Sequence, residues 1–255
     1  MTVAGSIQTP VPRIAFLAYE LSRRGSGVAV VARLVAKALA ERQQSGLCEV
    51  RALVLRDCDE AESWGFPVAS AGGSRLVFFA KAQRLVLASD VAVYDCANMA
   101  RVHALLKRVR PATVYIHGIE LWEDARQKWV DACRRADLRV ANSSYTLRRA
   151  VRAHGPVGPT DVCWLATEED AGQGPPSANP NREPNALIVG RMSTDEGYKG
   201  HRELIEAWPR VVQRVPKAVL NIVGTGSGAA KLEGLSGQSS VSANIRFHGF
   251  VSKER

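Results

Sequence analysis

Two cationic side chains flank a polar loop within residues 185–208. Four apolar residues, 186–189, precede Gly190 and Arg191, and an amphipathic segment begins near Lys199. This order predicts a strand, a loop and a helix. Such a loop, at the carboxyl end of a strand in an open α/β sheet, is a usual ligand site, and the helix N-terminus offers N–H groups to an anion. With the two added positive charges, the arrangement favours binding of a diphosphate.

Two further predicted strand ends carry residues that could act on a ligand. His117 and Gly118 follow an apolar segment, so a parallel sheet would place this imidazole at its carboxyl edge. Asp57 and Asp59 have the spacing of a carboxylate pair that could hold a metal beside a diphosphate. A solvated loop is the better interpretation of the two aspartates, because cationic residues are already available for a diphosphate. We therefore predict no metal site.

Two glycine-containing loops also follow predicted strands. RRGSG at 23–27 leads from an apolar segment into the predicted helix 28–42, and GTGSG at 224–228 follows the predicted strand 217–224. Glycine at such turns either lets the backbone approach a ligand or supplies a positive φ, and both interpretations stay open. The second loop reads GxGxG rather than GxGxxG, which alone is weak evidence for a dinucleotide site.

The wider pattern predicts two domains with parallel sheets. Apolar strand-like segments alternate with helix-like segments along the chain, which is typical of an α/β fold. Residues 166–184 are rich in Gly, Pro, Asn and charge, and predict a linker between a domain at 1–165 and one at 185–255. A doubly wound domain needs two βαβαβ halves, but only three strands are predicted after the linker. We expect two Rossmann-like domains, the second incomplete.

Composition sets limits on the class of protein. The 34 Lys and Arg exceed the 25 Asp and Glu, and the net charge of +9 favours anionic partners. The five cysteines never occur as CxxC, so neither a disulfide framework nor a zinc site is predicted. The first thirteen residues lack an apolar signal-peptide core, and no run of about 18 apolar residues could cross a bilayer. We expect a cytoplasmic protein.

A group of arginines is concentrated late in the first predicted domain. One interpretation is a contact with the anionic inner face of a membrane, and the simpler one is a solvated protein surface. The group consists of Arg134, Arg135, Arg139, Arg148, Arg149 and Arg152.

Several short motifs together resemble the retaining GT-B glycosyltransferases of group 1, glycosyltransferase family four. They are HGIE at 117–120, VGRM at 189–192, YKGHRELIEAW at 198–208, AVLNIVGTG at 218–226 and IRFHGFV at 245–251. The order and spacing of the last four, over about seventy residues, carry the resemblance.

This resemblance implies a function and a set of site residues. Arg191 and Lys199 would hold the diphosphate of a nucleotide-sugar donor, and His117 would bind the transferred sugar. The sugar would pass, with retention, to a glycan, lipid-linked or small-molecule acceptor, without a resident cofactor. Further donor contacts are implied for Gly25, Ser26, Gly27, Gly224, Gly226, Phe250 and Val251.

Compared with the resembled family, on the order of a hundred residues are absent after the third predicted strand of the second domain. They would include the E-x7-E element that contacts the donor. We expect either a fragment of a longer enzyme or a short form that depends on a partner. The alternative function is a non-catalytic nucleotide-sugar-binding or scaffolding protein. Nucleic-acid binding is the weakest hypothesis, because it rests only on net charge.

Overall fold

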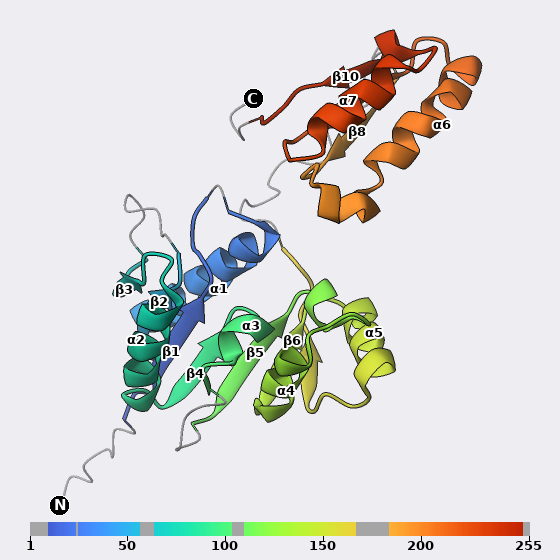
Figure 1. Cartoon of the computed structure of the whole chain (residues 1–255). Coiled ribbons are helices and arrows are strands. Elements are labelled where there is room, and N and C mark those ends of the chain that lie inside the picture. Colours follow the sequence, from blue (N-terminus) through green and yellow to red (C-terminus); the bar gives the residue numbers. More distant parts are fainter. Residues whose placement is uncertain (1–9, 24, 57–63, 104–109, 167–183, 252–255) are drawn as a thin grey trace, which may run out of the picture. The chain divides into compact units, whose positions relative to one another are not determined.

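The computed structural model describes residues 10–23, 25–56, 64–103, 110–166 and 184–251 (Figure 1). The chain divides into two compact units, residues 1–172 and 173–255, here called the N-terminal and C-terminal units. Each unit is built on a parallel sheet, in agreement with the predicted α/β class. Most of the predicted linker, and Asp57 and Asp59, lie outside the described residues.

The N-terminal unit contains a seven-stranded parallel sheet with the order β3-β2-β1-β4-β5-β6-β7. Its central strands are apolar on both faces, as expected of parallel strands covered by helices on both sides. The strands are β1 (Arg13–Ala18), β2 (Glu49–Val54), β3 (Val68–Ser70), β4 (Val91–Tyr94), β5 (Ala112–Ile116), β6 (Leu138–Ala141) and β7 (Thr160–Val162).

Helices cover the two faces of this sheet unequally. α1 (Gly27–Gln44) shares a buried cluster with Phe16 and Ala18, while Ala15 and Leu17 face the cluster on the other side. Right-handed crossovers explain this division, because the chain moves from β1 toward β2 in one direction and from β4 toward β5 in the other. The helices on the second face are α2 (Arg75–Leu87), α3 (Ala97–Ala100), α4 (Gln127–Arg135) and α5 (Ser144–His154).

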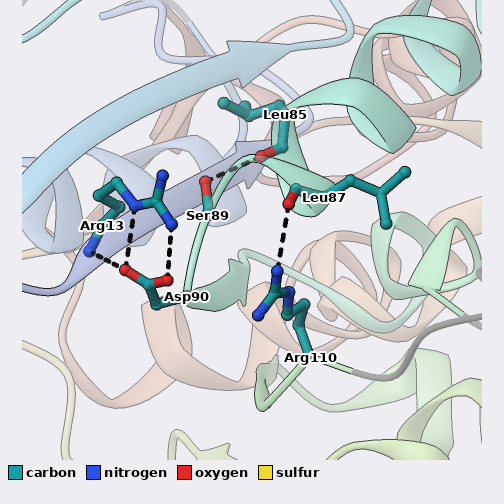
Figure 2. A network of polar contacts seen from close by, with 6 residues as sticks. All are labelled: Arg13, Leu85, Leu87, Ser89, Asp90 and Arg110. Atoms are coloured by element: carbon teal, nitrogen blue, oxygen red, sulfur yellow. Dashed lines mark hydrogen bonds and ion pairs between the residues drawn. The ribbon is translucent and has the colours of Figure 1, made fainter.

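A bidentate ion pair fixes the amino edge of this sheet (Figure 2). Arg13, at the start of β1, donates from Nε and Nη2 to the Asp90 carboxylate over 3.1 and 2.9 Å. The Arg13 backbone N–H also donates to Asp90 Oδ2, over 2.9 Å. These hydrogen bonds hold the pKa of Asp90 below its usual range. The pair joins the starts of two neighbouring strands, at the edge opposite to their carboxyl ends.

The C-terminal unit contains a three-stranded parallel sheet with the order β10-β9-β8. Its core includes Ile205 and Trp208 from α6, packed against Leu220 and Ile222. The other face of β8 leaves Leu187 exposed, at 63% of its surface. The elements are β8 (Asn185–Val189), α6 (His201–Arg214), β9 (Val219–Val223), α7 (Ala229–Gly237) and β10 (Ile245–Phe247).

Arg139 does not belong to the arginine surface that its sequence neighbourhood predicts. Its side chain is only 1% exposed, and it donates hydrogen bonds to the carbonyl groups at the C-terminal end of α4. The last carbonyl groups of a helix have no partner within the helix, so a buried guanidinium with several donors can satisfy them. Gly158 leaves room for it, since a Cβ there would lie 2.4 Å from Arg139 Nη1. The carbonyl groups that accept from Arg139 include those of Cys133, Arg134 and Ala136.

Arg139→Met should lower the free energy of unfolding of the N-terminal unit by about 3 kcal/mol or more, because it leaves several buried carbonyl groups without donors. Urea denaturation followed by circular dichroism measures this change. Arg135→Met is the matched control, since Arg135 is exposed in the last turn of α4. Equal destabilisation by both substitutions would contradict the structural role of Arg139.

Candidate functional site

The order of strands in the N-terminal unit creates a switch point between β1 and β4. In open α/β sheets, ligands bind at the carboxyl ends of the strands on either side of such a point. Asp95 follows β4 at this place and connects to the end of β1 in two ways. Its backbone N–H donates to Leu17 O over 3.0 Å, and its Oδ2 accepts from the Tyr19 N–H over 2.7 Å.

His117 lies at the same carboxyl edge, directly after β5, where its strand predicts it. Its Nε2 is 2.5 Å from the Asp95 backbone oxygen. Since a carbonyl oxygen only accepts, Nε2 carries the hydrogen, and Nδ1 of the neutral ring is then an acceptor. Asn142 Nδ2 donates to His117 O over 2.7 Å, which fixes the backbone beside β6. In its neutral form the imidazole is therefore held in one tautomer, which can accept from a hydroxyl group.

Asp95 was missed in the sequence analysis. It is 2% exposed, and its Oδ1 has no hydrogen-bond partner among the described residues. Burial is the main cause that raises its pKa, to about 6. A polar residue directly after the apolar β4 segment was the available signal, but such a position predicts neither burial nor the contact with His117.

Carboxylates occupy several backbone donors along this edge. Glu20 Oε1 accepts from the Ser26 N–H over 3.1 Å, and Glu120 Oε1 accepts from the His117 N–H over 2.5 Å. Together with the bond from Tyr19 to Asp95, three backbone N–H groups of the edge are bound to acidic side chains. These groups are therefore not presented to an anionic ligand.

The glycine loop before α1 is explained in part by packing. A Cβ at Gly25 would lie 2.5 Å from Ala29 Cβ and 2.8 Å from Glu20 Oε1, so the fold itself requires glycine there. At Gly27, the first residue of α1, a Cβ would meet no described atom within 4 Å. Of the three predicted contact residues in this loop, Gly27 has the open surroundings that a ligand needs. Arg24 lies outside the described residues.

In the C-terminal unit, Arg191 and Lys199 lie on the loop between β8 and α6, as predicted. Both are exposed, and Lys199 ends a short 3-10 helix, η3 (Thr194–Lys199). Gly200, with φ of 85°, then turns the chain into α6 at His201. A pocket of about 480 Å³ lies beside this helix start. Its polar lining includes Arg191, Ser193, Thr194, His201, Lys231 and Gln238.

The predicted nucleotide-binding glycines of the β9–α7 loop pack against the β8 loop. A Cβ at Gly224 would lie 1.9 Å from Gly190 O, and one at Gly226 would lie 2.4 Å from Met192 C and O. The Gly228 N–H donates to Met192 O over 2.7 Å. Interlocking of two loops therefore accounts for these glycines without a ligand. Phe250 and Val251, the other predicted contacts, follow β10 and are 69% and 36% exposed.

Neither a metal cluster nor a membrane-spanning helix occurs within the described ranges. No group of three or more His, Cys, Asp or Glu side chains could hold a metal ion there. Similarly, none of the helices described is long and apolar enough to cross a bilayer.

Asp95→Asn should change the pH dependence of stability. The pKa of Asp95 is about 6 in the fold against 3.8 for the free group, so stability falls as pH rises from about 4 to 6 and stays lower above. Asparagine removes this loss, which amounts to up to about 3 kcal/mol. Urea denaturation should therefore show that the free energy of unfolding of the variant, relative to that of the wild type, is higher at pH 7.5 than at pH 4.5.

Asp90→Asn is the control for this experiment. The pKa of Asp90 is below its usual range, so its carboxyl is largely ionised in both folded and unfolded chains between pH 4.5 and 7.5. Its stability difference from the wild type should stay nearly constant. A constant difference for Asp95→Asn as well would contradict the buried, protonatable carboxyl.

Gly226→Ala should destabilise the C-terminal unit by about 1–3 kcal/mol, because the new methyl group collides with the Met192 backbone. Gly234→Ala is the matched control, since it lies in α7 with no atom within 4 Å of a new Cβ. That substitution should leave stability unchanged or raise it slightly. If Gly226→Ala were equally harmless in thermal denaturation, the loop packing would not explain this glycine.

Comparison with known proteins finds a family that resembles the C-terminal segment. Residues 183–255 match the family described as "Glycosyl transferases group 1". A separate similarity links this chain to chloroplastic glyceraldehyde-3-phosphate dehydrogenase A of Nicotiana tabacum, at 43% identity over 53 residues. That similarity covers 21% of this chain, and the chain spans only 14% of the length of this curated relative.

Solved structures with a similar fold include three sugar-related proteins. HepE of Anabaena, determined in complex with UDP-glucose, has a TM-score of 0.69 at 20% identity, covering 94% of this chain and 70% of that one. Sucrose-phosphate synthase of Thermosynechococcus elongatus has a TM-score of 0.67 at 15% identity, covering 94% and 71%. The lipopolysaccharide outer core galactosyltransferase WaaB has a TM-score of 0.63 at 15% identity, covering 95% and 69%.

These likenesses confirm the fold that the motifs predict, with a seven-stranded and a smaller three-stranded parallel sheet. Residues 183–255 thus resemble the group 1 glycosyltransferases, and the described part of the chain has a GT-B-like α/β fold.

Proposed function

We propose that this protein transfers a sugar, with retention at the anomeric carbon, from a nucleotide-diphosphate donor to an acceptor. The observation that carries the proposal is the placement of Arg191 and Lys199 on one loop, at the carboxyl end of β8 and before the N-terminus of α6. Two cations and the positive end of a helix dipole favour a diphosphate at this point. The loop also lies inside the segment that matches the family.

The charges of Arg191 and Lys199 would act most strongly during bond cleavage. When the glycosidic bond breaks, negative charge builds on the departing diphosphate. Cations that are already in position stabilise this charge more than they stabilise the bound donor, so they lower the barrier. Gly224, Gly226, Phe250 and Val251 would adjoin the nucleotide through their backbone.

The N-terminal unit would bind the sugar rather than the phosphates. His117 presents Nδ1 as an acceptor, which suits a sugar hydroxyl group. Three carboxylates already occupy backbone donors along this edge, so the edge repels a diphosphate and favours hydroxyl groups. Of the loop residues, Gly27 keeps the open surroundings for a donor contact, whereas the Ser26 N–H is bound to Glu20.

The acceptor would be a glycan, a lipid-linked sugar or a small molecule. A lipid-linked acceptor would bring a cytoplasmic enzyme to the inner face of a membrane. UDP-glucose is the first donor to test, because HepE of Anabaena was determined with it.

Lys199→Ala should lower donor affinity or turnover by about a hundredfold, since loss of one preorganised charge-stabilising group typically has this effect. Lys217→Ala is the matched control, because this exposed lysine precedes β9 at the opposite edge of the same sheet. Calorimetric titration with a panel of nucleotide sugars measures binding, and release of free nucleotide measures turnover.

Each outcome has a separate meaning. Loss in Lys199→Ala alone supports the diphosphate site. Donor binding without nucleotide release, in the presence of a range of acceptors, would favour a non-catalytic nucleotide-sugar-binding protein. Equal behaviour of both lysine variants would refute the site.

A further inference from the structure

The outward surface of α5 forms a cationic and apolar face that the sugar-transfer proposal does not use. We propose that this α5 face docks the protein on a bilayer of anionic phospholipid. The face is defined by Tyr145, Arg148, Arg149, Val151 and Arg152.

The helix presents this face because its other side is fixed in the core. Ser143 caps its N-terminus by accepting from the Thr146 N–H over 3.1 Å, and Gly155, with φ of 73°, ends it. Thr146 and Ala150 are buried against the sheet. At 100° per residue, positions 145, 148, 151 and 152 then fall on the opposite side, toward solvent, and Arg149 lies half-buried at its border.

Charge on this face is almost entirely of one sign. α5 contains no Asp or Glu, and it carries three arginines within five residues. Among the described ion pairs, the one that involves this helix joins Arg149 to Glu123. The pKa of Glu123 is lowered chiefly by Arg149 and in part by Arg152. The face therefore keeps an excess of positive charge.

Apolar and aromatic surface accompanies these charges. Tyr145 is 53% exposed and Val151 is 39% exposed. Arg149 Cζ lies 4.1 Å above the centre of the Trp122 ring, and Trp122 meets Tyr145 edge-on at 5.9 Å. This stacking holds Tyr145 and Arg149 in place, so the surface that meets the bilayer is preformed.

A shallow hollow of about 550 Å³ lies over the α5 face, lined mostly by apolar atoms. The stems of arginine provide such apolar walls while the guanidinium groups stay at the rim. Phospholipid headgroups match this arrangement, because phosphate binds the rim and the glycerol and upper acyl region cover the floor. Tyrosine also prefers the bilayer interface. A nucleic acid would use the charges but not the exposed Val151.

The test is sedimentation of the full chain with vesicles of phosphatidylcholine containing about 30% phosphatidylglycerol, at about 0.1 M salt, against pure phosphatidylcholine vesicles. Binding is expected to the anionic vesicles only. Arg148→Glu/Arg152→Glu should weaken it about thirtyfold or more, since each basic residue near an anionic leaflet contributes roughly a fivefold factor. Tyr145→Ser/Val151→Ser should weaken binding without changing its dependence on salt.

The matched control is Arg75→Glu/Arg84→Glu on α2, which changes the net charge equally at the opposite end of the same sheet (Figure 1). Circular dichroism checks that all variants fold. The proposal is overturned if anionic vesicles are not bound, if the α2 variant loses as much affinity as the α5 variant, or if a generic DNA duplex binds more tightly through the same arginines. Failure of UDP-sugar binding would leave this result unaffected, because the vesicle assay needs no donor.

Discussion

The N-terminal unit depends on how the ends of its three central strands are joined at the carboxyl edge. Asp95 makes this junction: its backbone N–H and its carboxylate bond to the end of β1, and its carbonyl oxygen accepts from His117 after β5. The junction places a buried carboxyl beside the residue that the sequence singles out. Burial opposes the ionisation of Asp95 and so lowers the stability of the unit. The same residue, however, holds the imidazole of His117 in position.

In the C-terminal unit, backbone contacts rather than side chains join the loops at the carboxyl edge of the sheet. Gly190 and Met192 of the β8 loop receive the glycines of the β9–α7 loop so closely that side chains are excluded. Met192 accepts from Gly228 and donates to Thr225, so the loop that starts with Arg191 is fixed at its base. Glycine in a motif of this kind can thus serve a ligand indirectly, by holding a neighbouring loop.

Sequence reasoning predicted the periodic parts of the molecule well. The segments of α1, β8, α6 and β9 were recognised from apolar runs, helical spacing and turns, and these elements exist near the predicted bounds. The short β3 escaped notice, because three residues show no period. Arg139 was wrongly assigned to the surface, since sequence spacing does not reveal that a guanidinium will terminate a neighbouring helix. Asp95 was missed for a similar reason: its burial depends on strands far apart in the chain.

The carboxyl edges of the two sheets differ in charge, and this difference predicts that they favour different chemical groups. The edge of the N-terminal unit binds Asp95, Glu20 and Glu120 to its own backbone donors, whereas the loop after β8 carries Arg191 and Lys199. A diphosphate placed against the first edge would meet acids and donors already in use. A neutral hydroxyl group has no such repulsion and can donate to Nδ1 of the neutral His117 ring. The first edge therefore favours hydroxyl groups, and the second favours phosphates.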